Sequence, residues 1–114
     1  MRESKSGALS LRDAANRARA GGRIADAFAA LETANHVSPG DPELLRELAE
    51  RATELGDFEA AARFLRELAG LLTGNKQGET LLELADLYYD RLDDVPRARA
   101  AMREAADAFT GTRR

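Results

Sequence analysis

The sequence contains no cysteine and no tryptophan, a single histidine, and only 5% aromatic residues among its 114 positions. Without cysteine, disulfide bonds, thiolate zinc sites and cysteine nucleophiles are excluded together. One histidine cannot build an ordinary zinc site, and His36 stands beside a predicted helix end, where a solvent-exposed or helix-capping role is better supported than catalysis. No serine lies in a nucleophile-elbow motif, and GNKQGET lacks the ending of a phosphate-binding loop. The sequence therefore predicts a protein that is not an enzyme and uses no cofactor and no metal.

Long apolar runs and an excess of positive charge are missing as well. Nowhere do about 18 apolar residues follow one another, so neither a membrane span nor the apolar core of a signal peptide is predicted. The net charge is -3, whereas nucleic-acid-binding proteins are more often clearly basic. We expect a soluble, cytoplasmic protein that inserts in no membrane and binds no nucleic acid. Its richness in alanine and its preference for arginine over lysine are typical of a bacterial gene.

Alanine is the commonest residue, with 23 copies, so burial must come from many small contacts between closely approaching backbones. Apolar residues recur at i, i+3, i+4 and i+7, as in Leu45, Leu48, Ala49 and Ala52, which is the period of an amphipathic helix. Alternating patterns of strand type are absent. The pattern predicts an all-α fold of six helices, at about 8–20, 24–37, 42–55, 57–72, 79–92 and 95–109.

One unit is repeated three times along the chain. The second helices of the first two copies align at a spacing of 34 residues, through Gly22 with Gly56, Ala27 with Ala61 and Leu31 with Leu65. A third copy follows at 37, with Ala98 on Ala61 and Met102 on Leu65. The first helices match too, as Leu11, Ala14, Ala15 and Ala18, then Leu45, Leu48, Ala49 and Ala52, then Leu81, Leu84, Ala85 and Tyr88. Three copies therefore account for nearly the whole chain.

The junctions between copies differ in kind. In SPGDPELL (38–45), Pro39 and Gly40 end one helix, Asp41 caps the next and Pro42 occupies its first turn. The second junction, LLTGNKQGETLL (71–82), is longer and has no proline, and its glycines predict a loose turn that is the most mobile internal loop. The third copy has no glycine at its tight turn and one extra residue before Asp94.

These residues resemble the tetratricopeptide repeat, a 34-residue pair of antiparallel helices. The first copy carries the family's small and large residues at Ala15, Gly22, Ala27, Leu31 and Ala34, and its closing Pro39. The resemblance implies a right-handed α-solenoid of three helix-turn-helix repeats. It divides the chain into a polar N-terminal extension (1–7), a single domain (8–111) with repeats 8–41, 42–77 and 78–111, and a basic tail (112–114).

The same resemblance implies a concave groove, lined by the first helices, that binds a peptide or helix of a protein partner. Transferring the family's groove positions predicts a basic first repeat and acidic second and third repeats. The predicted partner therefore carries a basic or mixed-charge segment. The family's clamp for acidic tails is disfavoured, because Glu47, Glu79 and Glu83 stand where it requires an amide or a cation. The predicted contact residues are Arg12, Asn16, Arg19, Arg46, Glu50, Glu54, Leu82, Asp86, Tyr89 and Asp90.

Other interpretations stay open from the sequence alone. Exposed charges can serve only to solvate a helix, and Glu47 and Arg51 have the i,i+4 spacing that stabilises a helix without a ligand. Tyr88 is expected in the core, and Tyr89, about 100° further round the helix, is the better candidate anchor. A second function is self-assembly into a homo-oligomer through an uncapped C-terminal helix face, with Leu87, Ala101 or Phe109 left uncovered. A third is a segment of a longer array that regulates an attached domain.

Replacing Ala61 with aspartate tests the repeat assignment. Position 61 is predicted to lie where two helices approach closely, so the substitution buries an unpaired charge and should cost several kcal/mol of unfolding free energy. Thermal melting of Ala61→Asp, followed by circular dichroism, measures this cost. An unchanged melting temperature contradicts the assignment.

Overall fold

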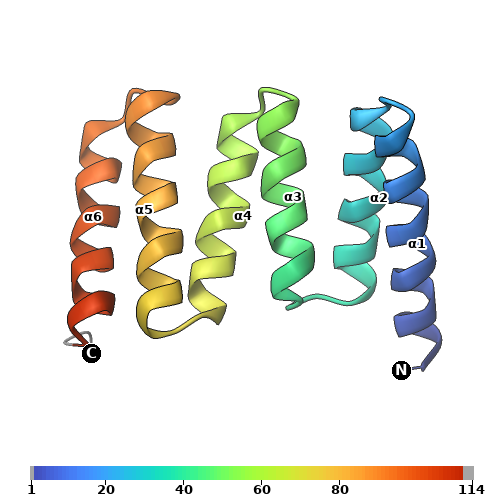
Figure 1. Cartoon of the computed structure of the whole chain (residues 1–114), viewed down its shortest axis with the longest axis horizontal. Coiled ribbons are helices and arrows are strands. Elements are labelled where there is room, and N and C mark those ends of the chain that lie inside the picture. Colours follow the sequence, from blue (N-terminus) through green and yellow to red (C-terminus); the bar gives the residue numbers. More distant parts are fainter. Residues whose placement is uncertain (1, 112–114) are drawn as a thin grey trace. The chain divides into compact units, whose positions relative to one another are not determined.

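The computed structural model describes residues 2–111, with side chains from Ser10 onward. Within these residues the chain forms helices and no strand (Figure 1). The helices are α1 (Arg2–Ala20), α2 (Ile24–Val37), α3 (Pro42–Glu54), α4 (Phe58–Leu71), α5 (Gly74–Asp90) and α6 (Val95–Thr110). The predicted all-α class and its six helices are confirmed. Met1 and the predicted tail 112–114 lie outside the described residues.

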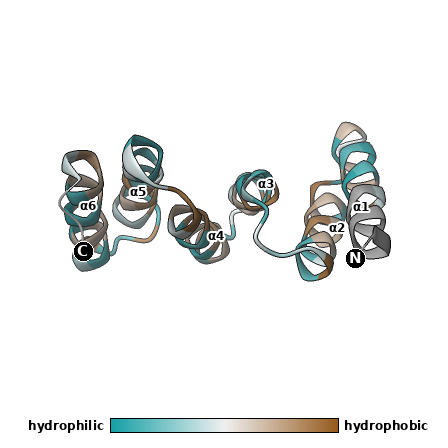
Figure 2. Ribbon diagram, turned by 90° about the horizontal axis from the view of Figure 1, so that it is seen from below, coloured by the Kyte–Doolittle hydropathy of each residue, from teal (hydrophilic) through white to brown (hydrophobic). Residues whose placement is uncertain are grey.

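The helices gather in two compact units. Unit 1 ends at Asp57 and contains α1 to α3, and unit 2 begins at Phe58 and contains α4 to α6. In unit 1, α2 packs against both α1 and α3, and in unit 2, α5 packs against both α4 and α6. Where Figure 2 colours them by hydropathy, the helices carry both hydrophilic and hydrophobic residues, as expected for amphipathic helices. The repeat boundaries 8–41, 42–77 and 78–111 and the handedness of the solenoid stay predictions.

Small residues make up much of the buried surface. On α6 the residues at 3- and 4-residue spacing that face the rest of unit 2 are all alanine, with exposed fractions between 0% and 4%: Ala98, Ala101, Ala105 and Ala108. Ala61 on α4 and Ala27 on α2 are also almost fully buried. With no large side chain at these positions, helix backbones can approach at the short end of the usual 8–10 Å range of helix packing.

Two predicted helix starts are wrong. α1 begins at Arg2 and not near residue 8, because RESKSGA lacks the apolar period from which the helix start was predicted. α5 begins at Gly74 and not at 79, so the predicted loose junction 71–82 is a two-residue connection, Leu72–Thr73. Two of its expected loop residues, Gln77 and Gly78, are buried in unit 2. The buried Gln77 donates its Nε2 hydrogen to the carbonyl oxygen of Ala69 at 2.9 Å, and Gly78 leaves room for the ring of Phe109.

The predicted end face is also corrected. Leu87 and Ala101 were expected to be uncovered, but their exposed fractions are 9% and 0%. Ala101 belongs to the alanine row that packs inside unit 2. Phe109 is exposed as expected, at 41%, and Met102, which aligns with the buried Leu65, is exposed at 45%.

The junction between α2 and α3 follows the sequence prediction. α2 ends at Val37 before Pro39, and Gly40 adopts a left-handed φ of 86°. The carboxylate of Asp41 accepts hydrogen bonds from the backbone N–H groups of Glu43 and Leu44, and Pro42 occupies the first turn of α3. Asp41 is therefore a helix cap, which satisfies donors that have no partner within the helix.

The turns after α1, α3 and α5 share one feature, a residue in the left-handed conformation shortly after the helix ends. In the first two, a left-handed glycine (Gly22, φ 80°; Gly56, φ 79°) precedes a backbone N–H that bonds back five residues, from Arg23 to Ala18 and from Asp57 to Ala52. In the third turn Leu92 N–H also bonds back five residues, to Leu87 at 3.1 Å, and the extra residue adds a bond from Asp94 N–H to the carbonyl oxygen of Tyr88 at 2.8 Å. Asp93 takes the left-handed conformation there, with φ 51° and without being glycine.

Asp93→Gly should therefore stabilise the protein. A left-handed conformation costs a residue with a Cβ about 1–2 kcal/mol, and glycine removes this cost. Glycine is also more flexible in the unfolded chain, which lowers the net gain in stability by about 0.5–1 kcal/mol. We expect the free energy of unfolding to rise by roughly 0.5–1 kcal/mol in urea titrations. Asp93→Ala is the control, because it keeps a Cβ and should give no gain. Equal stabilisation by both variants contradicts the explanation.

Candidate partner-binding surface

The ten predicted contact residues fall on both units, and each unit is described by itself. Unit 1 carries six of them, on α1 and α3: Arg12, Asn16, Arg19, Arg46, Glu50 and Glu54. Unit 2 carries four, all on α5: Leu82, Asp86, Tyr89 and Asp90. All are exposed except Arg12 and Arg46, which are half-buried.

Arg12 is held inside unit 1 by three carboxylates. Its guanidinium lies 3.0 Å from Glu47, 3.5 Å from Asp41 and 3.7 Å from Glu43, and only 25% of its side chain is exposed. Its Nη2 donates a hydrogen bond to Oε1 of Glu47. Arg12 therefore joins α1 to the start of α3, and its positive charge is already balanced by carboxylates of its own chain.

Arg51, on α3, also pairs with carboxylates of its own chain. Its side chain is 8% exposed, and it lies 3.4 Å from Glu50 and 2.8 Å from Glu54. The Nε–H of Arg51 does not point at the carboxylate of Glu54, so this contact is an ion pair and not an aligned hydrogen bond. The i,i+4 pair expected between Glu47 and Arg51 is wrong, because Glu47 pairs with Arg12. Two predicted acidic contacts, Glu50 and Glu54, are thus partly neutralised.

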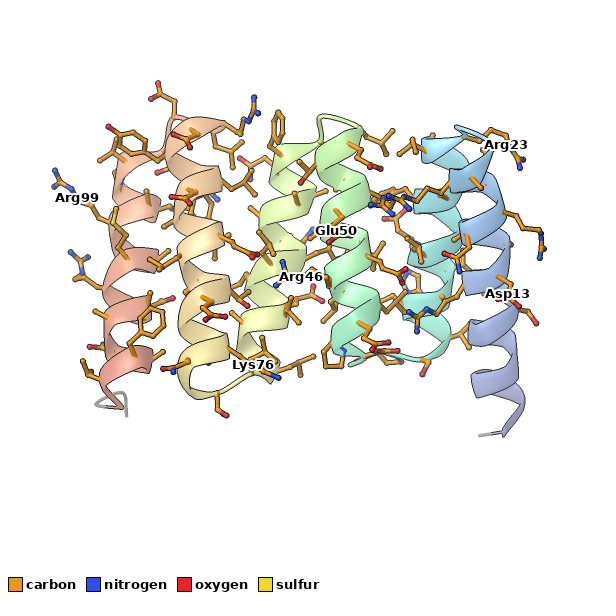
Figure 3. The ribbon with its side chains drawn as sticks, viewed as in Figure 1. Asp13, Arg23, Arg46, Glu50, Lys76 and Arg99 are labelled. Carbon is orange, nitrogen blue, oxygen red and sulfur yellow. The ribbon has the colours of Figure 1, made fainter. Side chains whose placement is uncertain are left out.

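The remaining contact residues of unit 1 differ in exposure. Asn16 and Arg19 are exposed on α1. Arg46 is half-buried on α3, one turn before Glu50 (Figure 3). Sequence reasoning missed the cluster around Arg12. The available signal was the presence of three acids at 41–47, around Arg46, the residue that the 34-residue repeat aligns with Arg12.

The exposed side of α5 is different, because acidic side chains surround two large apolar ones. Leu82 is 42% exposed and Tyr89 58% exposed. The exposed carboxylates of the helix are Glu79, Glu83, Asp86 and Asp90. Within the part of the chain that the structure describes, neither Asp86 nor Asp90 is in an ion pair. We call these six residues the α5 surface.

Tyr88, in contrast, belongs to the interior, as predicted. It is 6% exposed, and the guanidinium of Arg97 lies 4.6 Å from the centre of its ring. Arg97 also pairs with Asp94 and, at 3.1 Å, with Glu59 of α4. The hydrogen bond from the Arg97 side chain, followed by that from its backbone N–H, lowers the pKa of Asp94 below its ordinary value. This cluster connects the three helices of unit 2.

Unit 2 also has a cavity of about 210 Å³ between α4, α5 and α6. Arg66 and Glu104 form an ion pair beside it, and Gln77 and Asp107 add polar groups to its lining. No group of three or more His, Cys, Asp or Glu side chains that could hold a metal occurs among the described residues. His36 is exposed. No described helix is long and apolar enough to span a bilayer.

Comparisons with known proteins agree with this geometry. A family model described as tetratricopeptide repeat matches residues 18–72. No curated protein matches the sequence. Among solved structures, the N-terminal domain of stress-induced protein-1 (STI-1) from C. elegans has a TM-score of 0.76 and 13% sequence identity, over 93% of this chain and 87% of that one. At this identity the likeness shows the fold alone.

The charge cluster at Asp94 predicts how stability depends on pH. Because the pKa of Asp94 is lowered by folding, its contribution is present above the ordinary value near 4 and is lost as the pH falls through the lower folded value. Asp94→Asn keeps a capping side chain but removes the charge. We expect the stability gap between wild type and Asp94→Asn, measured by urea titration, to be constant near neutral pH and to shrink below about pH 4. A gap that does not change with pH contradicts the assigned role of the charge.

Proposed function

The chain belongs to the tetratricopeptide repeat family, and on that premise we propose that it is a non-catalytic protein-interaction module that binds a basic or mixed-charge peptide or helix of a partner. The observation that carries this proposal is the α5 surface. It exposes an aromatic and an aliphatic side chain within a row of carboxylates that lacks internal cationic partners at Asp86 and Asp90.

Tyr89 is the proposed anchor of the complex. Aromatic side chains are over-represented among the residues that dominate binding energy, and among the side chains that the structure describes Tyr89 has the largest exposed fraction of the large apolar ones, 58%. Leu82 lies seven residues earlier, so the two are about 10 Å apart along the same side of the helix. Two apolar side chains of a partner helix, also two turns apart, match this spacing.

The carboxylates supply the charge preference. Asp86 and Asp90 flank the anchor, so they attract a basic segment, increase its association rate and repel an acidic one. In unit 1, Glu50 and Glu54 are expected to contribute less, because Arg51 already pairs with both. Arg12 is occupied by three carboxylates, which supports the exclusion of an acidic tail as ligand.

A pair of synthetic peptides tests the proposal. The first is a short amphipathic helix of leucine and lysine, and the second has glutamate in place of each lysine. We expect fluorescence anisotropy to show binding of the lysine peptide that weakens from ~0.05 M to ~0.5 M salt, because surface charges are screened over that range. Tyr89→Ala should weaken it by roughly tenfold or more, and Asp86→Asn with Asp90→Asn should reduce the salt dependence.

Matched substitutions away from α5 provide the controls. Leu71→Ala removes another apolar side chain, 47% exposed, and Asp13→Asn removes an exposed carboxylate that projects from α1 away from α2 (Figure 3). Neither should change binding. Equal binding of the glutamate peptide, or an effect of Asp13→Asn equal to that of the α5 variants, contradicts the proposal.

A further inference from the structure

The exposed large apolar side chains of the described residues are concentrated on one helix hairpin. Of the seven such side chains, five lie on α5 and α6: Leu82, Tyr89, Val95, Met102 and Phe109. Their exposed fractions range from 37% to 58%. Single exposed apolar residues are normal on a protein surface, but a group of this kind on one hairpin is not.

On α6 these side chains point away from α4. The side of α6 that faces α4 is marked by Glu104 and Arg97, which pair with Arg66 and Glu59 of α4. At 100° per residue, Met102 lies about 160° round the helix from Glu104. Val95 and Phe109, seven residues before and after Met102, lie on the same side as Met102.

On α5 the two exposed apolar side chains, Leu82 and Tyr89, also lie away from the side that faces α4. Gln77 marks the side of α5 that faces α4, since its side chain bonds to the Ala69 carbonyl. Leu82 and Tyr89 lie about 120–140° round the helix from Gln77. Gly78 marks the side facing α6, because a Cβ there would be 2.8 Å from the Phe109 ring, and Leu82 follows one turn later.

Together the five side chains form one row. α5 and α6 run antiparallel with Gly78 opposite Phe109, so side chains from the two helices alternate down the hairpin: Phe109, Leu82, Met102, Tyr89, Val95. We call this row and its borders the terminal face. Its border on α5 is acidic, with Glu79 and Asp86. Its border on α6 is basic, with Arg99 and Arg103, and Arg99 projects away from α5 (Figure 3).

We propose that the terminal face binds the terminal face of a second copy of this chain, about a twofold axis parallel to the helices. This axis places α5 of each copy against α6 of the other. Each acidic border then meets a basic border, twice in the dimer, and the apolar rows pack between them. The antiparallel register brings Asp86 level with Arg99 and Arg103 of the second copy. A twofold axis perpendicular to the helices would place α5 against α5 and its acids against acids, which is unfavourable.

A second copy fits better than a simple charged helix. A uniformly basic helix complements only the α5 border, and a uniformly acidic one only the α6 border. The same chain supplies both signs at the right borders together with a matching apolar row. Because Leu82 and Tyr89 belong both to this face and to the α5 surface, a second copy and a peptide would exclude one another.

Sedimentation velocity of the whole chain, without any peptide, tests the dimer from ~10 µM to ~1 mM, a range that covers weak association. Asp86→Arg and Arg99→Glu should each weaken dimerisation by roughly tenfold or more, because each opposes like charges across the interface. The double variant Asp86→Arg/Arg99→Glu exchanges the two signs and should restore it. Met102→Lys should leave a monomer, and Asp13→Arg on α1 is the control without effect.

Circular dichroism checks that every variant stays folded, as expected for exposed positions. A chain that is monomeric at all concentrations overturns the proposal, and it does so even if another protein or a further segment covers this face. So does a double variant that remains as weak as the single ones, because the charges then do not pair across the axis. Since no peptide is present, failure here leaves the proposed function untouched.

Discussion

The rest of the structure depends on close contact between alanine-lined helices. Ala98, Ala101, Ala105 and Ala108 occupy the buried side of α6 with almost no exposed surface, and alanine recurs at equivalent places on α2 and α4. A helix that packs through alanine buries little area per residue, so stability is spread over many contacts. Charged pairs such as Arg97 with Asp94 and Glu59 add connections between the helices of unit 2.

Because alanines fill the buried side of α6, several larger side chains of α5 and α6 remain at the surface. Met102 on α6 and Leu82 and Tyr89 on α5 remain exposed, and Phe109 is partly exposed although its ring lies over Gly78. In unit 1 the charges are already paired, at Arg12 and at Arg51. The predicted contact residues whose carboxylates have no ion pair among the described residues, Asp86 and Asp90, therefore lie on α5, and the proposed basic or mixed-charge partner rests on them.

The periodic part of this structure could be predicted from sequence, because it depends on local spacing. Helix type, the Asp41 cap and the opposite burial of Tyr88 and Tyr89 follow from residues a few positions apart, and the repeat follows from the return of the same local pattern after about 34 residues. The start of α5 could not be predicted, because Gly74 and Gly78 are typical of a turn. The contacts that hold this segment, from Gln77 to the Ala69 carbonyl and from the Phe109 ring to Gly78, form only in the folded unit. The pairing of Arg12 with Glu47 was missed because it joins residues 35 positions apart. Residue type alone cannot separate a paired charge from an unpaired one.

The most direct test of the binding surface is an NMR titration that follows backbone amide shifts as the leucine and lysine peptide is added. The account predicts that the largest changes occur on α5, at Leu82, Asp86, Tyr89 and Asp90. The amides around Arg12 and Glu47 should change little, because that cluster is already satisfied within unit 1. Largest shifts on α1, with α5 unaffected, would contradict it.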